Sequence, residues 1–361
     1  MNTLIKYGAC AALFMLSSCW SPRIDEKYAA ATVQNELSLS GNISAQKLSG
    51  GFSGTMNFLV SDALKKYVVR FIENGPHREV EVFNFKIASH GGYGPHVYLA
   101  DSSRGIVIME YLSGKKISYE DMQSDQLYVA LAHLLLKIHS GPAFKNSGYN
   151  VFKRIEHAIQ INKPKNSAYI PLAKIEQIIT IIHQTLSPHL IKSIPCHNDL
   201  HKGNLVFTEN EFKAIDYGDA AQGDPYYDVA TVANATSFFA TPAHERILLA
   251  TYLERQPTRT EEAKLYLMKQ VVWIKWAFDT LYRLRLSPEI IHQYELLKVP
   301  VLTELAREES YGTFDLSKSE DNLKLLKVLI NQIFDNFESQ NFGNAVSLLK
   351  KMKQNEERKD Y

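Results

Sequence analysis

The feature that most constrains this chain is a polar loop at residues 196–204, followed closely by an acidic turn at residues 215–218. The loop reads Cys-His-Asn-Asp-Leu-His-Lys-Gly-Asn, and the turn reads Ile-Asp-Tyr-Gly. Between them lie an apolar run at 205–207, a polar turn at 208–210 and a second apolar run from Phe212. Two short apolar runs joined by a polar turn are typical of a β-hairpin. The fold must therefore bring the loop and the turn to the open end of one hairpin.

The polar residues of this stretch have the spacing that phosphoryl transfer from ATP requires. That reaction needs one carboxylate to orient the attacking hydroxyl, together with an amide and a second carboxylate that hold Mg²⁺. Asp199, Asn204 and Asp216 supply these groups in the order known for kinase catalytic loops. The alternative is a surface loop with solvated acids, and the hairpin between the two motifs disfavours it. We therefore predict Asp199 as the catalytic residue and Asn204 and Asp216 as metal ligands.

The loop resembles those of two related families of small-molecule kinases. Cys-His-Asn-Asp-Leu is similar to the catalytic loop of choline and ethanolamine kinases, and Asp-Leu-His-Lys-Gly-Asn is similar to that of aminoglycoside phosphotransferases. The resemblance is dense over residues 196–230 and thinner from Lys47 to Trp276. It implies an α+β, bilobed, protein-kinase-like fold with a five-stranded β-rich N-lobe and a mostly helical C-lobe. It also implies ATP and Mg²⁺ as cofactors. Where protein kinases carry a lysine, this chain has His201, which we expect to touch the transferred phosphoryl group.

The resemblance extends to the part of the chain that would hold the nucleotide. Residues 47–60 read as a strand, a small-residue turn and a second strand, similar to the phosphate loop of choline kinases (Gly-Gly-x-Ser-x-x-x-Asn). Glycine lets backbone amides approach phosphate, and a hydroxyl adds a donor. On its own the pattern is weak, because glycine-rich hairpins are common. The nucleotide-binding residues expected from this stretch are Gly50, Gly51, Ser53 and Thr55.

Three further positions follow from kinase-like organisation. Arg70, in an apolar strand, stands where kinases place the phosphate-binding lysine of their third strand. Glu81 on the helix 78–89 is its expected ionic partner, with Glu79 as the rival and a solvated helix charge as the plain alternative. Glu110 and Tyr111 resemble the hinge whose backbone binds adenine.

The apolar pattern predicts the elements around these positions. Residues 91–100 and 105–111 read as two strands, residues 124–138 have the three- and four-residue spacing of a helix, and Glu176–His189 reads as another helix. His139, at the end of the first of these helices, is expected to be a packed histidine rather than a ligand.

The substrate side is suggested by two tryptophans in the predicted helix 261–285. Trp273 and Trp276 are three residues apart, so their rings share one helix face. Choline kinases surround the quaternary ammonium with tryptophans, and an acid such as Asp219 or Asp279 would add negative charge. The alternative is that both rings are core residues, which is the common role of such pairs. Asp228, which opens another helix, is interpreted as an anchor for the catalytic loop.

Composition excludes some partners. The 361 residues contain 40 basic and 39 acidic side chains, so nothing indicates binding to nucleic acid. With Cys10, Cys19 and Cys196 as its three cysteines, the chain has no disulfide framework. Residues 1–19 resemble an export signal ending in a bacterial lipoprotein box, in which Cys19 would be lipidated. ATP is scarce outside the cytoplasm, so the ATP requirement predicts a cytoplasmic protein, and a processed leader predicts a membrane-anchored one instead.

The sequence therefore predicts a leader or N-terminal helix at 1–24, an N-lobe at 25–112, a C-lobe at 113–350 and a charged tail at 351–361. The expected activity is phosphorylation of a hydroxyl on a small amine-bearing molecule, first choline or ethanolamine. An aminoglycoside or another small alcohol is the alternative substrate. A different class of function, an exported pseudokinase or binding protein, is favoured by the leader and disfavoured by the intact Asp199, Asn204 and Asp216.

Overall fold

The computed structural model describes most of the chain between residues 23 and 357, and it divides the chain into two compact units. One unit comprises residues 1–75 and 97–111, and the other comprises 76–96 and 112–361. The predicted leader, including Cys19, lies outside the described residues. The described ranges are 23–48, 55–115, 117, 121–145, 148–166, 170–208, 211–237, 241–284, 292–294, 297, 304–305, 308 and 314–357.

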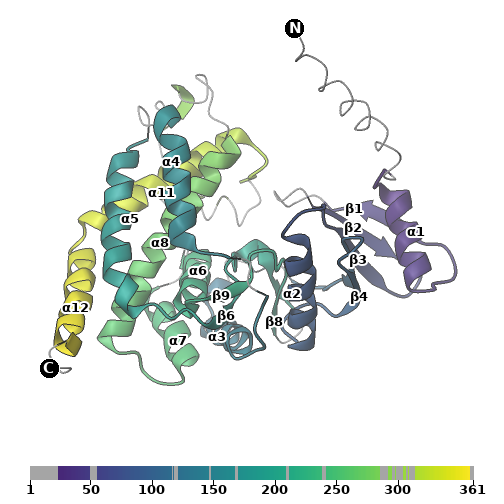
Figure 1. The fold of residues 1–361 in the computed structure, drawn as a ribbon, viewed down its shortest axis with the longest axis horizontal. Coiled ribbons are helices and arrows are strands. Elements are labelled where there is room, and N and C mark those ends of the chain that lie inside the picture. The colour runs from purple at the N-terminus through teal and green to yellow at the C-terminus, as the bar shows by residue number, and fades with distance from the viewer. Residues whose placement is uncertain are drawn as a thin grey trace, which may run out of the picture. The chain divides into compact units, whose positions relative to one another are not determined.

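The first unit is a five-stranded antiparallel sheet with one helix packed on it (Figure 1). Helix α1 packs Ala29 and Val33 against Phe58 and Phe71 of the sheet, and this apolar contact forms the core of the unit. The sheet has the five strands that the sequence resemblance implied for an N-lobe, and their order is β1-β2-β3-β5-β4. The elements are α1 (Glu26–Glu36), β1 (Ser44–Lys47), β2 (Met56–Ser61), β3 (Lys66–Phe71), β4 (Val97–Asp101) and β5 (Ile106–Glu110).

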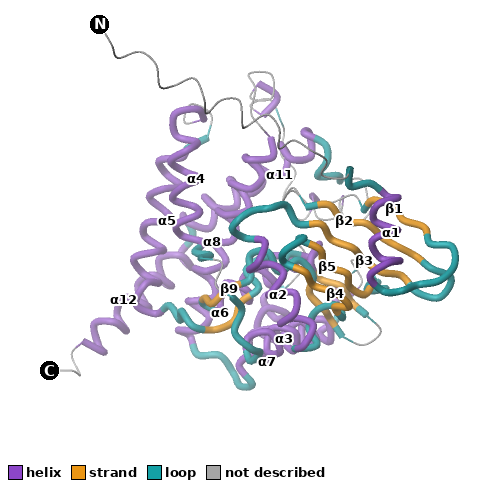
Figure 2. Tube along the Cα trace, turned by 45° about the vertical axis from the view of Figure 1, so that its right-hand side comes forward, coloured by secondary structure: helices purple, strands orange, loops and turns teal. Residues whose placement is uncertain are grey.

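The second unit is mostly helical, and helix α8 runs through its centre. In Figure 2, helices α4, α5 and α11 lie beside α8, and α6 and α12 also contact it. Its apolar residues, from Ala263 to Leu284, are buried along most of its length. The helices are α2 (Arg78–His90), α3 (Asp125–His139), α4 (Val151–Asn166), α5 (Leu172–Leu186), α6 (Pro225–Ser237), α7 (Pro242–Leu253), α8 (Arg259–Leu284), α11 (Ser319–Glu338) and α12 (Gln340–Glu357).

Two small antiparallel strand pairs in this unit position the loops of the predicted site. The pair β7 (Leu205–Phe207) and β8 (Phe212–Ala214) is the expected hairpin, and a hydrogen bond of 3.0 Å from the Ile215 amide to the Asn204 carbonyl extends it. The pair β6 (Ile194–Cys196) and β9 (Ala221–Gly223) fixes the start of the catalytic loop. The prediction that one hairpin brings the loop and the acidic turn together is therefore confirmed.

Other elements differ from their predicted limits. A strand was expected from Gly91, but β4 begins at Val97, because residues 91–94 form a turn that buries the ring of Tyr93. The Tyr93 hydroxyl has no hydrogen-bond partner among the residues that the structure describes. Helix α5 begins at Leu172 rather than Glu176, and α12 continues to Glu357 into the charged segment predicted as a tail.

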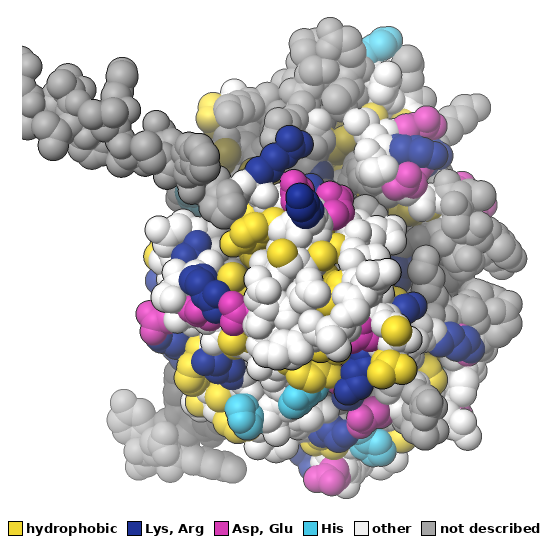
Figure 3. Space-filling view, turned by 90° about the vertical axis from the view of Figure 1, so that its right-hand side faces the viewer, with side chains coloured by type: hydrophobic (Ala, Val, Ile, Leu, Met, Phe, Trp, Pro, Cys, Tyr) yellow, Lys and Arg dark blue, Asp and Glu magenta, His cyan; other side chains and the backbone are white. Residues whose placement is uncertain are grey.

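The described surface agrees with the near-zero net charge of the chain. On the face shown in Figure 3, basic and acidic side chains lie interspersed. Many of the basic side chains are paired with acids, as in the ion pairs Arg104–Glu36 and Lys137–Glu211. Within the described ranges, no helix is both long enough and apolar enough to cross a membrane.

Candidate active site

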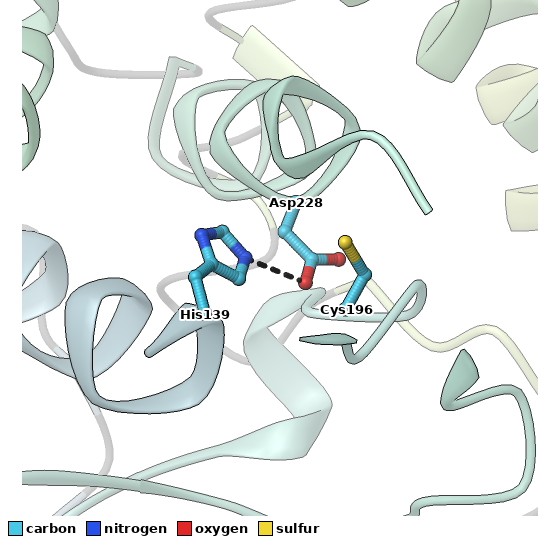
Figure 4. A group of neighbouring side chains, drawn as sticks. All are labelled: His139, Cys196 and Asp228. Carbon is cyan, nitrogen blue, oxygen red and sulfur yellow. Dashed lines mark hydrogen bonds and ion pairs between the residues drawn. The ribbon is translucent and has the colours of Figure 1, made fainter. Parts of the chain in front are cut away.

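The catalytic loop is anchored by Asp228, which lies in the first turn of α6. Its carboxylate accepts hydrogen bonds from the backbone amides of His197 (2.6 Å) and Asn198 (2.7 Å). Nε2 of His139, at the end of α3, lies 3.2 Å from the same carboxylate. Figure 4 shows the His139 ring directed at the Asp228 side chain. Asp228 is completely buried, so these contacts replace the water that the charge has lost. The prediction that Asp228 anchors the loop is confirmed, and His139 is a packed histidine at a helix end, as expected.

Cys196 lies beside this anchor and completes a buried group of His139, Cys196 and Asp228 (Figure 4). All three could in principle bind a metal, because their donor atoms lie within 4.8 Å of one another. Both ring nitrogens of His139 already have partners, since Nδ1 lies 2.9 Å from the Tyr252 hydroxyl. Burial raises the pKa of the Cys196 thiol well above its usual value, so the thiol is a packed and unreactive side chain.

His197, the first histidine of the motif, is a structural residue. Its Nε2 lies 3.0 Å from the Ile215 carbonyl, and its Nδ1 accepts the Asp199 amide at 3.3 Å. The ring is fully buried, and this burial lowers its pKa, so the ring is neutral and donates from Nε2. His197 therefore ties the start of the catalytic loop to the strand end that leads into Asp216.

Asp199, the predicted catalytic residue, is held by the side chain of Asn204. The Asn204 side chain donates its Nδ2 hydrogens to the Asp199 carbonyl (2.9 Å) and to Oδ2 of the Asp199 carboxylate (3.1 Å). Burial raises the pKa of Asp199 to about 7. The Lys275 ammonium lowers this pKa in part, and the neighbouring carboxylates of Asp219, Asp279 and Asp216 raise it further. A carboxyl group that titrates near neutral pH is suited to accepting a proton from an alcohol.

Asn204 and Asp216 fit the magnesium site that the motif predicts. The amide nitrogen of Asn204 is directed at Asp199, which leaves its Oδ1 as the free end of the amide, without a hydrogen bond among the described residues. Asp216 adopts a left-handed backbone conformation with φ 67°, which holds it at the turn after the hairpin. An amide oxygen and a carboxylate are oxygen donors of the kind that Mg²⁺ prefers.

Helix α2 distinguishes between the two glutamates proposed for the nucleotide side. Glu79 is exposed and forms an ion pair with Lys145. Glu81 is buried near Asp216, since a Cβ placed at Gly218 would lie 3.6 Å from Asp216 Oδ1 and 3.8 Å from Glu81 Cδ. The structure therefore brings Glu81 close to the acidic turn that is predicted to bind the metal.

The remaining nucleotide-side residues belong to the first unit or lie outside the description. Arg70 is buried in β3, and its guanidinium lies 3.5 Å from Asn57 Oδ1. The backbone amide of Tyr111, expected to face adenine, donates to the Lys66 carbonyl at 3.2 Å, and Glu110 ends β5. Thr55 directly precedes β2. Gly50, Gly51 and Ser53 lie outside the described residues, and the pairing of Arg70 with Glu81 stays a prediction.

Near Asp199, two ion pairs hold Asp219 and Asp279, the acids that were candidates for amine binding. Asp219 is held by Arg154 of α4 through two bonds, of 2.7 Å and 3.0 Å, one to each carboxylate oxygen. Asp279 receives Lys275 on Oδ2 at 2.7 Å, one helical turn earlier on α8. The Lys275 side chain is 12% exposed and that of Asp279 is 39% exposed. Arg154 and Lys275 were not expected from the sequence.

The two tryptophans of α8 differ in burial. Trp273 is 3% exposed and belongs to the core, whereas Trp276 is half-buried. Their ring centroids are 5.4 Å apart with the rings nearly perpendicular, so the edge of one ring packs on the face of the other. Trp273 is thus a support for Trp276, and the ring of Trp276 is the one that is partly open to solvent.

Comparison with known proteins agrees with this arrangement. The profile of the phosphotransferase enzyme family (APH) matches residues 44–265 of this chain, which include the whole catalytic loop and the acidic turn. The chain belongs to this family. Membership of the phosphotransferase enzyme family confirms the predicted family and enzyme class.

Individual relatives of this phosphotransferase are distant. Protein LicA of Haemophilus influenzae is 23% identical over 211 residues, which are 56% of this chain and 61% of LicA. Thiamine kinase of Escherichia coli is 28% identical over 140 residues, which are 38% of this chain and 45% of that protein. The matches thus span about half of the length of these relatives.

Solved structures confirm the kinase-like fold. A choline/ethanolamine kinase family protein from Mesorhizobium loti superposes with a TM-score of 0.66 at 16% identity, covering 90% of this chain and 98% of that protein. A structure of LicA in complex with AMP superposes with a TM-score of 0.57 at 18% identity, covering 86% and 98%. At these identities the likeness shows the fold and leaves the substrate to be inferred from the site.

Proposed function

We propose that this phosphotransferase transfers the γ-phosphoryl group of ATP to the hydroxyl of a small amine-bearing alcohol, with choline or ethanolamine as the first candidates. The observation that carries the proposal is the arrangement of Asp199, Asn204 and Asp216 around one hairpin. Asp199 is held by Asn204, and the Ile215 amide bonds to the Asn204 carbonyl directly before Asp216. Phosphoryl transfer depends mainly on this kind of positioning.

Each group has a defined role in this proposal. Asp199 orients the acceptor hydroxyl and accepts its proton as the oxygen attacks the γ-phosphorus and the bond to the ADP leaving group breaks. Asn204 Oδ1 and the Asp216 carboxylate would hold Mg²⁺, which neutralises the charge of the ATP phosphates when bound. Arg70 and the 50–55 turn are assigned to the nucleotide phosphates, with Glu81 assigned to orient Arg70. Glu110 and Tyr111 are assigned to the adenine side.

The preference for an amine-bearing acceptor rests on which carboxylate oxygens of the two ion pairs accept no hydrogen bond from the described residues. Both carboxylate oxygens of Asp219 are used by Arg154, whereas Asp279 keeps Oδ1 without a partner among the described residues. Asp279 is also the more exposed member of its pair with Lys275. Asp279 is therefore the acid available to an ammonium group. The partly open ring of Trp276 would add about 2 kcal/mol of cation–π attraction once water is excluded.

A second acceptor class is favoured by the same two ion pairs. The pairs Arg154–Asp219 and Lys275–Asp279 each combine a hydrogen-bond donor with an acceptor, so positive and negative groups alternate near Asp199. Such alternation suits an alcohol with several polar groups, such as an aminoglycoside, better than the compact charge of choline. The exported pseudokinase is the remaining alternative, and the intact set of Asp199, Asn204 and Asp216 disfavours it.

A panel of small alcohols tests the proposal directly. Purified protein with ATP and Mg²⁺ is mixed with choline, ethanolamine, thiamine or an aminoglycoside, and ADP formation is followed with Asp199→Asn as the blank. We expect ADP formation above that blank with one amine-bearing alcohol. Binding of an ATP analogue with no turnover on any member of the panel would support the pseudokinase instead.

Matched substitutions then locate the amine site. Asp279→Asn should raise the KM for the amine substrate by about tenfold, the loss of one charge-assisted contact, and leave the KM for ATP unchanged. Asp219→Asn is the control, because its carboxylate is already committed to Arg154, and it should change the same KM by less than about threefold. Equal effects of the two substitutions would remove the basis for assigning the amine to Asp279.

Two further substitutions distinguish the roles of Trp276 and Trp273. Trp276→Ala should raise the KM for the amine substrate with little change in thermal stability, because its ring is half-buried. Trp273→Ala should instead destabilise the protein by about 3–5 kcal/mol, because it opens a cavity in the core. If a folded Trp276→Ala variant handles the amine substrate like wild type, the proposed aromatic contact is wrong.

A further inference from the structure

We propose that His201 is a positioning residue for Asp199, acting as a neutral N–H donor whose tautomer is set by the backbone of Gly203. This role differs from direct contact with the transferred phosphoryl group. It deepens the proposed function, and only the kinetic part of its test depends on that function.

The tautomer follows from the contact between His201 and Gly203. Nδ1 of His201 accepts the backbone N–H of Gly203 at a distance of 3.0 Å. A ring nitrogen that accepts a hydrogen bond carries no hydrogen, so the single hydrogen of a neutral imidazole lies on Nε2. A doubly protonated ring would place two donors against each other at this contact. The backbone of the loop therefore selects the neutral ring that is protonated on Nε2.

That Nε2–H faces the catalytic carboxylate. Nε2 of His201 lies 3.6 Å from Oδ2 of Asp199, slightly beyond hydrogen-bond distance. Catalytic hydrogen bonds are often long in the absence of substrate and tighten in the reacting complex.

The two donors to Asp199 act on the same oxygen. Asn204 Nδ2 donates to Oδ2 at 3.1 Å, and His201 Nε2 approaches that oxygen as well. Among the described residues, no donor is directed at Oδ1 of Asp199. The structure thus assigns Oδ2 as the held oxygen and Oδ1 as the oxygen that takes the proton of the acceptor alcohol.

The contact between His201 and the backbone depends on glycine at position 203. A Cβ at Gly203 would lie 2.8 Å from Cε1 and 3.0 Å from Nδ1 of the His201 ring. The first of these separations is shorter than a van der Waals contact, so any side chain would push the ring away. A glycine two residues after the histidine therefore permits the close approach of backbone and ring.

The tautomer can be observed without any substrate. Long-range ¹H–¹⁵N correlation spectra of the full chain at pH 7 report which ring nitrogen of His201 carries hydrogen, with His201→Gln identifying its signals. We expect an unprotonated Nδ1 and a protonated Nε2 in wild type, and a loss of this uniform state in Gly203→Ala. A His201 ring protonated on Nδ1, or on both nitrogens, would overturn the proposal.

Two amide substitutions test the positioning role. The side-chain nitrogen of Gln reaches the place of Nε2, whereas that of Asn reaches only the place of Nδ1. With ATP and choline, or whichever panel alcohol supports ADP formation, His201→Gln should keep kcat within about threefold. His201→Asn should lower kcat by at least about tenfold with the KM for ATP unchanged, because the carboxylate is left misplaced. Equal losses in both variants would indicate a phosphoryl contact and would contradict positioning.

Gly203→Ala provides the coupling test. It should lower kcat in the wild-type background and cause no further loss in the His201→Asn background, because the ring is then absent. Additive losses would mean that Gly203 acts independently of His201. If no alcohol in the panel is phosphorylated, the proposed function fails, while the spectra still decide the tautomer.

Discussion

Asp199 and Asp228 serve the same loop and are treated in opposite ways by the fold. Asp228 is 0% exposed and receives two backbone amides and a histidine nitrogen. The Asp199 side chain is 29% exposed, and in the described part of the chain only the Asn204 amide lies within hydrogen-bond distance of its carboxylate. At the anchoring end of the loop, the Asp228 carboxylate therefore accepts several hydrogen bonds. At the other end, which is the reacting end under the proposed function, the Asp199 carboxylate accepts few.

This difference teaches how a rigid loop can carry a reactive group. A buried carboxylate with a full set of donors stabilises the ionised form and fixes the backbone around it. A poorly solvated carboxylate with few donors has a raised pKa, as Asp199 does, and is a better proton acceptor. The residue that stabilises the loop is thus different from the residue proposed for its chemistry. Substituting Asp228 should therefore affect stability, and substituting Asp199 should affect turnover.

The largest expected effect is on the anchoring end. Asp228→Ala leaves the buried amides of His197 and Asn198 without an acceptor, so we expect the free energy of unfolding to fall by about 3–5 kcal/mol. Chemical denaturation measures this loss. Asp335→Ala on α11 is the control, because Asp335 is exposed, and it should change stability by less than about 0.5 kcal/mol. Similar values for the two variants would show that Asp228 is not an anchor.

The next effect is on turnover at the reacting end. Asp199→Asn should leave ATP binding nearly intact and lower kcat by at least about a hundredfold, because the positioned base is lost. The variant should fold as well as wild type, in contrast to Asp228→Ala. Steady-state kinetics and calorimetric ATP titration check both statements. Full activity in Asp199→Asn would show that the carboxylate is not the base.

A smaller effect concerns the pH dependence of stability. The folded pKa of Asp199, about 7, lies above its ordinary value of 3.8, so between these values the folded chain holds a proton that the unfolded chain has lost. The contribution of Asp199 to stability is therefore fully present below pH 3.8 and is lost as the pH rises through 7. Asp199→Asn cannot ionise, so its stability relative to wild type should increase by about 2–3 kcal/mol between pH 5 and pH 8.

Denaturant titrations of both proteins at the two pH values measure this difference. A difference that stays constant between pH 5 and pH 8 would mean that the carboxyl is ionised throughout, and the contrast with Asp228 would then weaken. Magnesium is left out of these titrations, because a bound cation favours the ionised carboxylate.

The smallest expected effect is on stability when Cys196, which lies beside Asp228, is substituted. Its thiol packs beside the anchor and donates a long hydrogen bond, of 3.3 Å, to the Ile194 carbonyl. Cys196→Ala should therefore lower stability by about 1 kcal/mol and leave kcat unchanged. In the native protein the thiol should resist alkylation, because burial raises its pKa and blocks access. Rapid alkylation of native Cys196 with loss of activity would assign it to the reacting end instead.

The sequence predicted those parts of the site that depend on local spacing. Asp199, Asn204 and Asp216 could be found because a loop and a hairpin place them, and both are set by residues close in the chain. The helical period before His139 predicted α3, and the packed histidine at its end. The role of Asp228 followed from its position in the first turn of a helix after the acidic turn.

The parts that escaped prediction depend on distant contacts. Arg154 and Asp219 are 65 residues apart, and nothing in the spacing of α4 indicates that they meet. The i,i+4 spacing of Lys275 and Asp279 was a signal that could have been used. The turn at residues 91–94 was mistaken for the start of a strand, because the burial of Tyr93 depends on Phe144 and Tyr217 from elsewhere in the chain.

Helix α8 has a consequence for the evolution of this protein. Its apolar positions are committed to the interior, while Lys275, Trp276 and Asp279 lie on its partly open side. Under the proposed function, changes at Trp276 and Asp279 would alter acceptor preference while the apolar interior of the helix stays in place. Lys275 is less free to change, because its side chain is 12% exposed and pairs with Asp279. A library randomised at Trp276 and Asp279 would therefore vary which alcohol is chosen while the buried face of the helix is unchanged.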